Sequence, residues 1–197
     1  MEALPEGVKG KSQSDDARLF RKNTSVPLTF RPATADDIPL LRDLAIRTWR
    51  LSYQEMISPE QIDYMLEWMY SAEKIAEEMA GGVLWKVALS EGVPIGYLSL
   101  VFYGTHHAEL SKLYLLPEHQ GRGLGQQMLS HSFELAAAHG CAELRLRVNK
   151  NNTRALRAYE RAGFTVTDAL VADIGGGYVM DDYVLTRPVP RTVARPA

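Results

Sequence analysis

The sequence predicts one α/β (α+β) domain, with a central, mixed and mostly antiparallel sheet of about seven strands flanked by helices. Three observations support this prediction. Segments with apolar residues at helical spacing are interspersed with segments that alternate in polarity, as in mixed architectures. Glycine and proline separate most of these segments. The 197 residues are 46% hydrophobic and 23% charged, and a chain of this length and composition suits a single core.

The fold is predicted to begin with a short strand and three helices. A strand over residues 28–31 precedes a helix that has Asp36 in its first turn and that Thr34 can cap. Pro59 begins a second helix, because proline is favoured at the first helical position. A third helix covers residues 71–79 and ends before a glycine pair.

Strands then alternate with two further helices. Gly140 and Gly163 supply the left-handed residues that end these helices. We expect strands at 83–89, 95–103 and 109–116, a helix at 123–139, a strand at 143–148, a helix at 152–162, and strands at 164–171 and 178–185. The domain accordingly covers residues 28–187. Residues 1–27 and 188–197 are polar or lack a period, and we expect a flexible N-terminal extension and a flexible tail.

Composition excludes several classes of protein. The formal net charge of −2 lacks the basic excess of a nucleic-acid binder. Cys141 is the single cysteine, so the chain holds no internal disulfide and no thiolate cluster for a metal. The longest apolar run, residues 95–103, is too short to cross a membrane, and the first residues do not resemble a signal peptide. We therefore expect a cytoplasmic protein without metal, nucleic-acid or membrane partners.

The segment over residues 113–125 carries the chemistry. A strand leads into a glycine-rich turn that opens an amphipathic helix. Backbone N–H groups at a helix start are free and the helix dipole favours an anion, while glycine lets a phosphate approach closely. This pattern predicts a phosphorylated ligand, and its alternative is a simple tight turn between strand and helix.

Two common phosphate loops do not fit. The P-loop needs Gly-Lys-Ser/Thr at the helix start, but Gln126 follows Gly125. The dinucleotide fingerprint needs a third glycine and an acid at the end of the next strand, and neither is present. The remaining pattern, Gln120-x-x-Gly123-x-Gly125, resembles the acyl-CoA loop of the GCN5-related N-acetyltransferases, the GNAT superfamily.

A second motif strengthens this resemblance. Residues 148–155, Tyr159, and Gly163 followed by Phe164 resemble the closing motif of the superfamily in their residue types and spacing. Together the two motifs cover about residues 95–170. The resemblance implies an acetyl-CoA-dependent N-acetyltransferase whose sheet splays apart between the fourth and fifth strands. It also implies that the donor's pantetheine arm lies in that gap like an added strand.

The resemblance also implies how the donor binds. Backbone N–H groups of the loop would hold the pyrophosphate, and Arg122 would add a cation unless it is a solvated surface residue. Backbone groups of Leu113 and Leu115 would contact the pantetheine arm, and one N–H there would stabilise the oxyanion. Asn152 would bond the same arm, cap its helix, or do both. The donor-binding set is Leu113, Tyr114, Leu115, Gln120, Gly121, Arg122, Gly123, Leu124, Gly125, Gln126 and Asn152.

Catalysis is expected to be direct transfer from the thioester to an amine. Tyr159 can protonate the departing thiolate, since a phenol is protonated at neutral pH, although it can also be a packing residue. Glu109 can accept the proton of the amine, and its alternative is a surface acid at a strand end. His106 and His107 are rival bases. Cys141 lacks the neighbours of an acyl-carrying nucleophile.

The acceptor is expected to be a primary amine of a small molecule. The segment Gly175 to Tyr183 and the Ser58-Pro59-Glu60 helix start faintly resemble polyamine-acetylating members of the superfamily. A protein or peptide acceptor, a non-catalytic acyl-CoA-binding domain, and an interaction protein with a vestigial loop stay open as alternatives. Many superfamily members form homodimers through their last strands. Acids in the selectivity regions would suit a cationic amine, although such charges are more often simply solvated; they are Glu55, Glu60, Asp63, Glu67, Asp173, Asp181 and Asp182, beside Tyr53.

Overall fold

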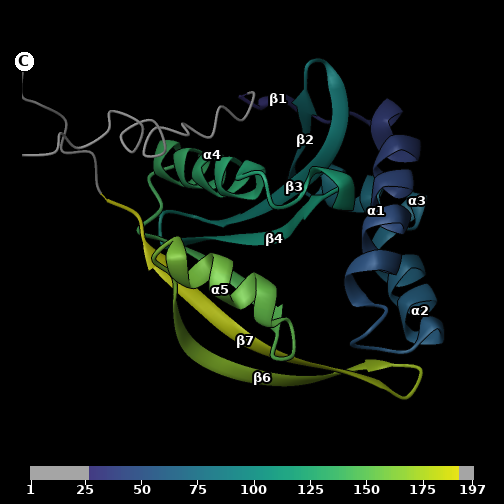
Figure 1. Cartoon of the computed structure of the whole chain (residues 1–197). Helices are drawn as coiled ribbons and strands as arrows, with labels where there is room; N and C mark the ends of the chain where they lie inside the picture. The colour runs from purple at the N-terminus through teal and green to yellow at the C-terminus, as the bar shows by residue number, and fades with distance from the viewer. Residues whose placement is uncertain (1–26, 191–197) are drawn as a thin grey trace, which may run out of the picture.

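The computed structural model describes residues 27–190, which form a seven-stranded sheet in the order β1-β2-β3-β4-β5-β7-β6 (Figure 1). Neighbouring strands are antiparallel except β4 and β5, which are parallel. This confirms the predicted fold class. The strands are β1 (Thr29–Pro32), β2 (Leu84–Ser90), β3 (Val93–Tyr103), β4 (His107–Leu115), β5 (Glu143–Asn149), β6 (Thr165–Gly175) and β7 (Tyr178–Pro188).

Helices cover both faces of the sheet. On the α1–α3 face, Leu41, Met65 and Trp85 belong to one buried cluster. On the α4–α5 face, Met128 and Leu144 belong to a second cluster. The α-helices are α1 (Ile38–Tyr53), α2 (Pro59–Tyr70), α3 (Ala72–Ala80), α4 (Leu124–Ala138) and α5 (Thr153–Arg161), with short 3₁₀ turns η2 (Ala35–Asp37) and η3 (Pro117–His119).

Local sequence accounts for where several helices begin. The Ser58 hydroxyl oxygen accepts the Gln61 N–H at 3.2 Å, with Pro59 at the first position of α2. The Asn152 Oδ1 atom accepts the Ala155 N–H at 3.1 Å and caps α5. Because these contacts are local, the sequence alone predicts them.

The sheet opens between β4 and β5. The two strands are paired only over His107 to Leu110 of β4 and Glu143 to Leu146 of β5. Beyond Leu110, β4 continues along β3 to Leu115 but has no partner on its other edge. This gap, called the opening below, confirms the predicted splay between the fourth and fifth strands.

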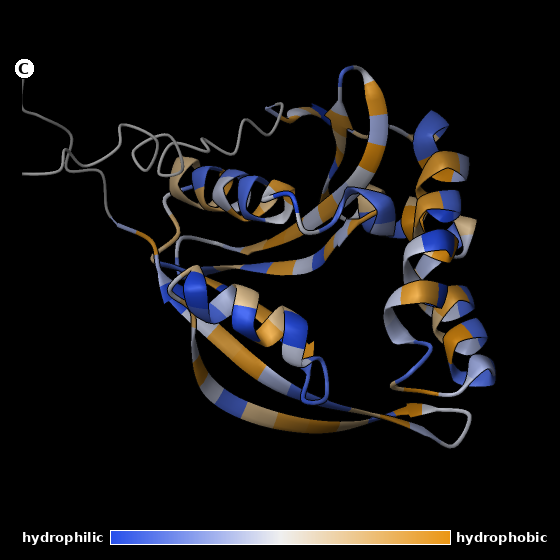
Figure 2. Cartoon of the chain, in the orientation of Figure 1, coloured by the Kyte–Doolittle hydropathy of each residue, from blue (hydrophilic) through white to orange (hydrophobic). Residues whose placement is uncertain are grey.

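The β6–β7 hairpin is longer than the sequence predicts. The sequence predicts a strand that ends at Val171, but β6 runs to Gly175. A contact from a distant helix helps to hold the added length: the Tyr64 hydroxyl of α2 donates to the Ile174 carbonyl at 2.5 Å. Figure 2 shows hydrophobic and hydrophilic residues alternating along this hairpin, whose β6 strand is mostly exposed.

The two predicted terminal segments lie mostly outside the described residues. Of the predicted N-terminal extension, residues 1–26 lie outside the described residues, as do residues 191–197 of the predicted tail. β7 continues to Pro188, and the Val189 side chain is buried. Among the helices of residues 27–190, none is both long and apolar enough to cross a membrane.

Candidate active site

The loop before α4 presents an open backbone. Gly121 and Gly123 have φ angles of 76° and 79°, which glycine adopts without strain. Across the part of the chain that the structure describes, no acceptor takes the backbone N–H groups of residues 121–125. A Cβ atom added at Gly121 or Gly125 would meet nothing within 4 Å. The loop therefore offers N–H groups and space to an anion at a helix start.

Gln120 fixes this loop to the strand before it. Its Nε2 atom donates to the Leu115 carbonyl at 2.8 Å. At the other side of the loop, Gln126 Nε2 donates to the Ala158 carbonyl of α5 at 3.2 Å. These two bonds tie the loop to β4, which borders the opening, and to α5, the helix that follows β5. Leu124 is buried beneath the loop and Arg122 is exposed.

The β4 residues at the opening point to opposite faces of the sheet. Leu113 and Leu115 pack in the cluster of the α4–α5 face, while the Tyr114 ring packs in that of the α1–α3 face. Their side chains are thus engaged in packing. Contacts between this edge of β4 and a ligand would come from the main chain, as the sequence resemblance implies.

Tyr159 lies on α5, two turns after Asn152. Its ring packs edge-on against Phe164, with ring centroids 5.8 Å apart. Burial raises the pKa of the Tyr159 phenol, and interaction with Tyr53 raises it further. The hydroxyl therefore stays protonated at neutral pH, as a proton donor must.

Two more tyrosines, Tyr53 and Tyr114, pack on the α1–α3 face of the sheet, opposite the face of Tyr159. Tyr53 ends α1, and its hydroxyl is 3.2 Å from that of Tyr114. Burial raises the pKa of both phenols, and Tyr159 interacts electrostatically with each. From the sequence, Tyr53 was expected only among the acceptor-selectivity residues, and Tyr114 only in the donor-binding set through its main chain. Their pairing joins residues 61 positions apart, and no local pattern indicates it.

Glu109 lies one residue before β4 separates from β5. Its Oε1 atom is 3.5 Å from Arg147 Nη2 of β5, and its side chain is 20% exposed. His107 lies further from the opening, where it stacks on Tyr103 with ring centroids 4.6 Å apart. Burial lowers the pKa of His107. Glu109 is thus the better placed of the sequence-derived bases.

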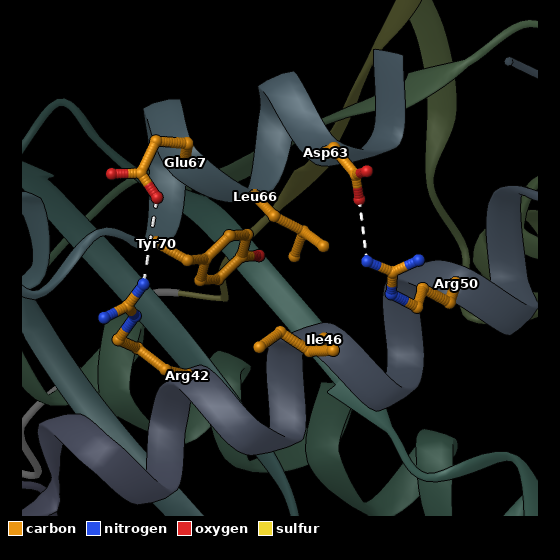
Figure 3. A pocket seen from close by; sticks show the side chains of 7 residues that line it. All are labelled: Arg42, Ile46, Arg50, Asp63, Leu66, Glu67 and Tyr70. Carbon is orange, nitrogen blue, oxygen red and sulfur yellow. Dashed lines mark hydrogen bonds and ion pairs between the residues drawn. The ribbon is translucent and has the colours of Figure 1, made fainter. Parts of the chain in front are cut away.

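Two acids of α2 pair with arginines of the neighbouring helix α1. Asp63 and Glu67 pair with Arg50 and Arg42 of α1, at 2.8 and 3.8 Å. Figure 3 shows these pairs around a hollow between the two helices, lined also by Ile46, Leu66 and Tyr70. This hollow lies apart from the glycine loop, Glu109 and Tyr159. Asp63 and Glu67 therefore form exposed ion pairs between α1 and α2, away from the glycine loop.

No group of three or more His, Cys, Asp or Glu side chains within residues 27–190 is arranged to hold a metal ion. Cys141 is buried and follows the far end of α4 from the glycine loop, where its thiol lies 3.6 Å from the Gly104 carbonyl.

Comparison with known proteins adds an independent finding. A model of the acetyltransferase (GNAT) family matches residues 40–164. The chain belongs to the GNAT acetyltransferase family. It is therefore an enzyme of the N-acetyltransferase type, as its two sequence motifs predicted, and the reading of the glycine loop as a mere turn is set aside.

Relatives of this family differ in their acceptors. The chain is 27% identical over 146 residues to a spermidine N(1)-acetyltransferase of Thermoplasma acidophilum, covering 72% of this chain and 90% of that protein. It is 29% identical over 107 residues to the peptidyl-lysine N-acetyltransferase YjaB of Salmonella typhimurium, covering 54% and 67%. Small-molecule and protein acceptors are thus both represented.

A solved structure supports the fold across most of the chain. The PaiA N-acetyltransferase of Thermoplasma acidophilum, in complex with coenzyme A, aligns with a TM-score of 0.71 and 25% identity. The alignment covers 82% of this chain and 98% of that one. The two chains therefore share the GNAT fold over most of this chain.

Proposed function

We propose that this GNAT protein transfers an acetyl group from acetyl-CoA directly to a primary amine of a small molecule, within a ternary complex. The observation that carries the proposal is the row of unengaged N–H groups at residues 121–125, which lies beside the opening in the sheet. The coenzyme A complex of the Thermoplasma relative supports the choice of donor.

The donor fits the residues present. N–H groups of the loop bind its pyrophosphate, since a helix start with free donors suits an anion. The unpaired edge of β4 over Leu113 to Leu115 binds the pantetheine arm by main-chain bonds, and Asn152 contacts the same arm while it caps α5. Acetyl-CoA supplies an activated thioester at the end of this arm.

Proton transfers complete the reaction. Glu109 removes a proton from the acceptor ammonium, directly or through water, because only the neutral amine is a nucleophile. The amine nitrogen then forms a bond to the acetyl carbon, the carbon–sulfur bond breaks, and the nitrogen loses its second proton to water as the amide forms. Tyr159 donates its proton to the departing thiolate. A main-chain N–H at the β4 edge stabilises the oxyanion of the intermediate.

A small-molecule acceptor is favoured over a protein. The spermidine acetyltransferase aligns over 90% of its length, against 67% for the peptidyl-lysine enzyme. Gly175 and Gly176, at the tip of the β6–β7 hairpin, also lie against Tyr64 of α2, which leaves less room for a large acceptor on the α1–α3 face. A protein acceptor is the second candidate.

A thiol-release assay tests the proposal. Purified protein and acetyl-CoA are incubated with polyamines, amino acids, aminoglycosides and peptides, and free thiol and acetylated product are measured. We expect release only with small primary amines. Turnover with peptides alone would establish the second candidate, and coenzyme A binding without turnover would indicate a non-catalytic domain. A cytoplasmic location and a homodimer through β6 and β7 stay predictions.

A further inference from the structure

Asp182 of β7 is a buried carboxylate without a partner. The residue is 4% exposed, and no hydrogen bond or ion pair reaches its side chain from any of residues 27–190. Burying a charge is costly unless it is paired, so such a group is uncommon in a folded protein. The cost is tolerated where a ligand supplies the missing partner.

The cations near Asp182 are already engaged. Arg147 of β5 forms the ion pair with Glu109. Lys150, after β5, is bound to the neighbouring acid Asp181. Burial raises the pKa of Asp182; Arg147 and Lys150 lower it, and Asp181 raises it. Tyr53 of α1 also faces this carboxylate, which raises the pKa of the phenol.

The position of Asp182 in the sheet places its side chain on the α1–α3 face, which is also the face of Glu109. Its neighbour Tyr183 packs in the cluster of the α4–α5 face, so Asp182 points to the α1–α3 face, on which Met180 also packs. Asp182 is paired with Asn149 at the end of β5, well past the point where β5 leaves β4. Its side chain therefore lies one strand beyond β5, the strand that borders the opening, on the face where Tyr114 also packs.

Asp182 and Glu109 are separated by β5. Two strand spacings amount to about 10 Å across the sheet, and the register sets Asp182 four residues further along β5 than Glu109, about 13 Å along the strands. The two carboxylates thus occupy different places on the same face, with Arg147 between them. The acceptor nitrogen that reacts beside Glu109 must first lose a proton. An ion pair between that nitrogen and Asp182 would stabilise the protonated ammonium, which is the unreactive form. Asp182 is better suited to a nitrogen that stays charged throughout.

We propose that the Asp182 carboxylate binds a second ammonium group of the acceptor, so that the enzyme prefers aliphatic diamines and polyamines to amines with one charge. This inference rests on the proposed N-acetyltransferase function. The observation that supports it is the buried, unpaired carboxylate of Asp182 on the same face of the sheet as Glu109. Asp182 thus acts as a specificity-determining residue.

The test compares diamines with amino alcohols of the same length. Diamines from 1,4-diaminobutane to 1,8-diaminooctane are each matched with the amino alcohol that has a hydroxyl in place of one amine. Steady-state kcat and KM are measured for the wild type, Asp182→Asn and Asp181→Asn. Asp181 is the matched control, because it points to the other face and is bound to Lys150. Calorimetry with coenzyme A checks that each variant is folded.

We expect the wild type to prefer the best diamine over its amino alcohol at least tenfold in kcat/KM. Asp182→Asn should abolish this preference, chiefly through a higher KM for the diamine, and Asp181→Asn should preserve it. A wild type that uses both substrates equally would overturn the inference, as would an Asp182→Asn variant with an unchanged preference or with equal losses on both substrates. A wild type that acetylates no amine would instead refute the proposed function.

Discussion

Removing Glu78 should destabilise the protein strongly, because it would leave a buried ammonium group unpaired. Lys112 Nζ of β4 donates to both Glu78 oxygens of α3, at 2.9 and 3.0 Å, and the two side chains are 3% and 17% exposed. Nζ also lies over the Trp85 ring, 4.8 Å from its centroid. Burial lowers the pKa of Lys112, and Glu78 raises it.

The expected size follows from this burial. Removing one partner of a buried ion pair costs about 3–5 kcal/mol. For a chain of this size, 1 kcal/mol corresponds to about 2–4 °C in Tm, so Glu78→Ala should lower Tm by roughly 6–20 °C at pH 7. Without Glu78 the pKa of Lys112 falls further. The difference in Tm between Glu78→Ala and the wild type should then narrow as pH rises toward 10, because Lys112 becomes neutral at a lower pH in the folded variant than in the unfolded chain.

Thermal and urea unfolding measure the effect. Glu77→Ala is the matched control on the same helix, since Glu77 and Lys74 form an exposed pair at 3.0 Å that is worth about 0–1 kcal/mol. The double variant Glu78→Leu/Lys112→Met should be close to the wild type, because apolar residues can replace a buried pair. A Glu78→Ala protein as stable as Glu77→Ala would refute the reasoning.

Three further predictions concern the active site. Tyr159→Phe keeps the ring packing on Phe164, so kcat should fall about 10²–10⁴-fold with little change in coenzyme A affinity; unchanged turnover would remove Tyr159 from the acid role. Glu109→Gln should change the pH profile of kcat/KM, and a profile superimposable on that of the wild type would clear Glu109 as the base. Asp182→Asn should raise Tm at neutral pH. Burial raises the pKa of Asp182 in the folded state, so the wild type loses stability as pH rises above the pKa of the unfolded state, and asparagine removes this loss. This gain should vanish in acid, where Asp182 is protonated in both states; a lower Tm at neutral pH would speak against it.

Features of the site that are local in sequence were predictable. The glycine loop, the caps at Ser58 and Asn152, and the order of strands and helices depend on residues a few positions apart. Such contacts are determined by backbone conformation and near-neighbour hydrogen bonds. They sufficed to locate the loop, whereas the opening was implied by the family resemblance; the two together define the proposed donor site.

Features that depend on the register of distant strands were not predictable. Asp182 was one of several acids in the sequence, and only the insertion of β7 between β5 and β6 makes it a buried residue next to the strand that borders the opening. In the same way, the pair of Glu109 with Arg147 requires the short parallel pairing of β4 with β5. The extra length of β6 is held in part by Tyr64, a residue of α2.

Calorimetric titration of coenzyme A into the wild type and Gly125→Ala tests the central claim most directly. Gly125 is in the first turn of α4, has no positive φ, and has no atom within 4 Å of an added Cβ. Alanine there should stabilise the helix by about 0.5–1 kcal/mol, yet its methyl group would occupy space that the pyrophosphate needs. We predict one molecule of coenzyme A per wild-type chain, and a Gly125→Ala protein with a higher Tm and at least tenfold weaker binding. No binding heat in the wild type, or equal affinity in the two proteins, would contradict the account.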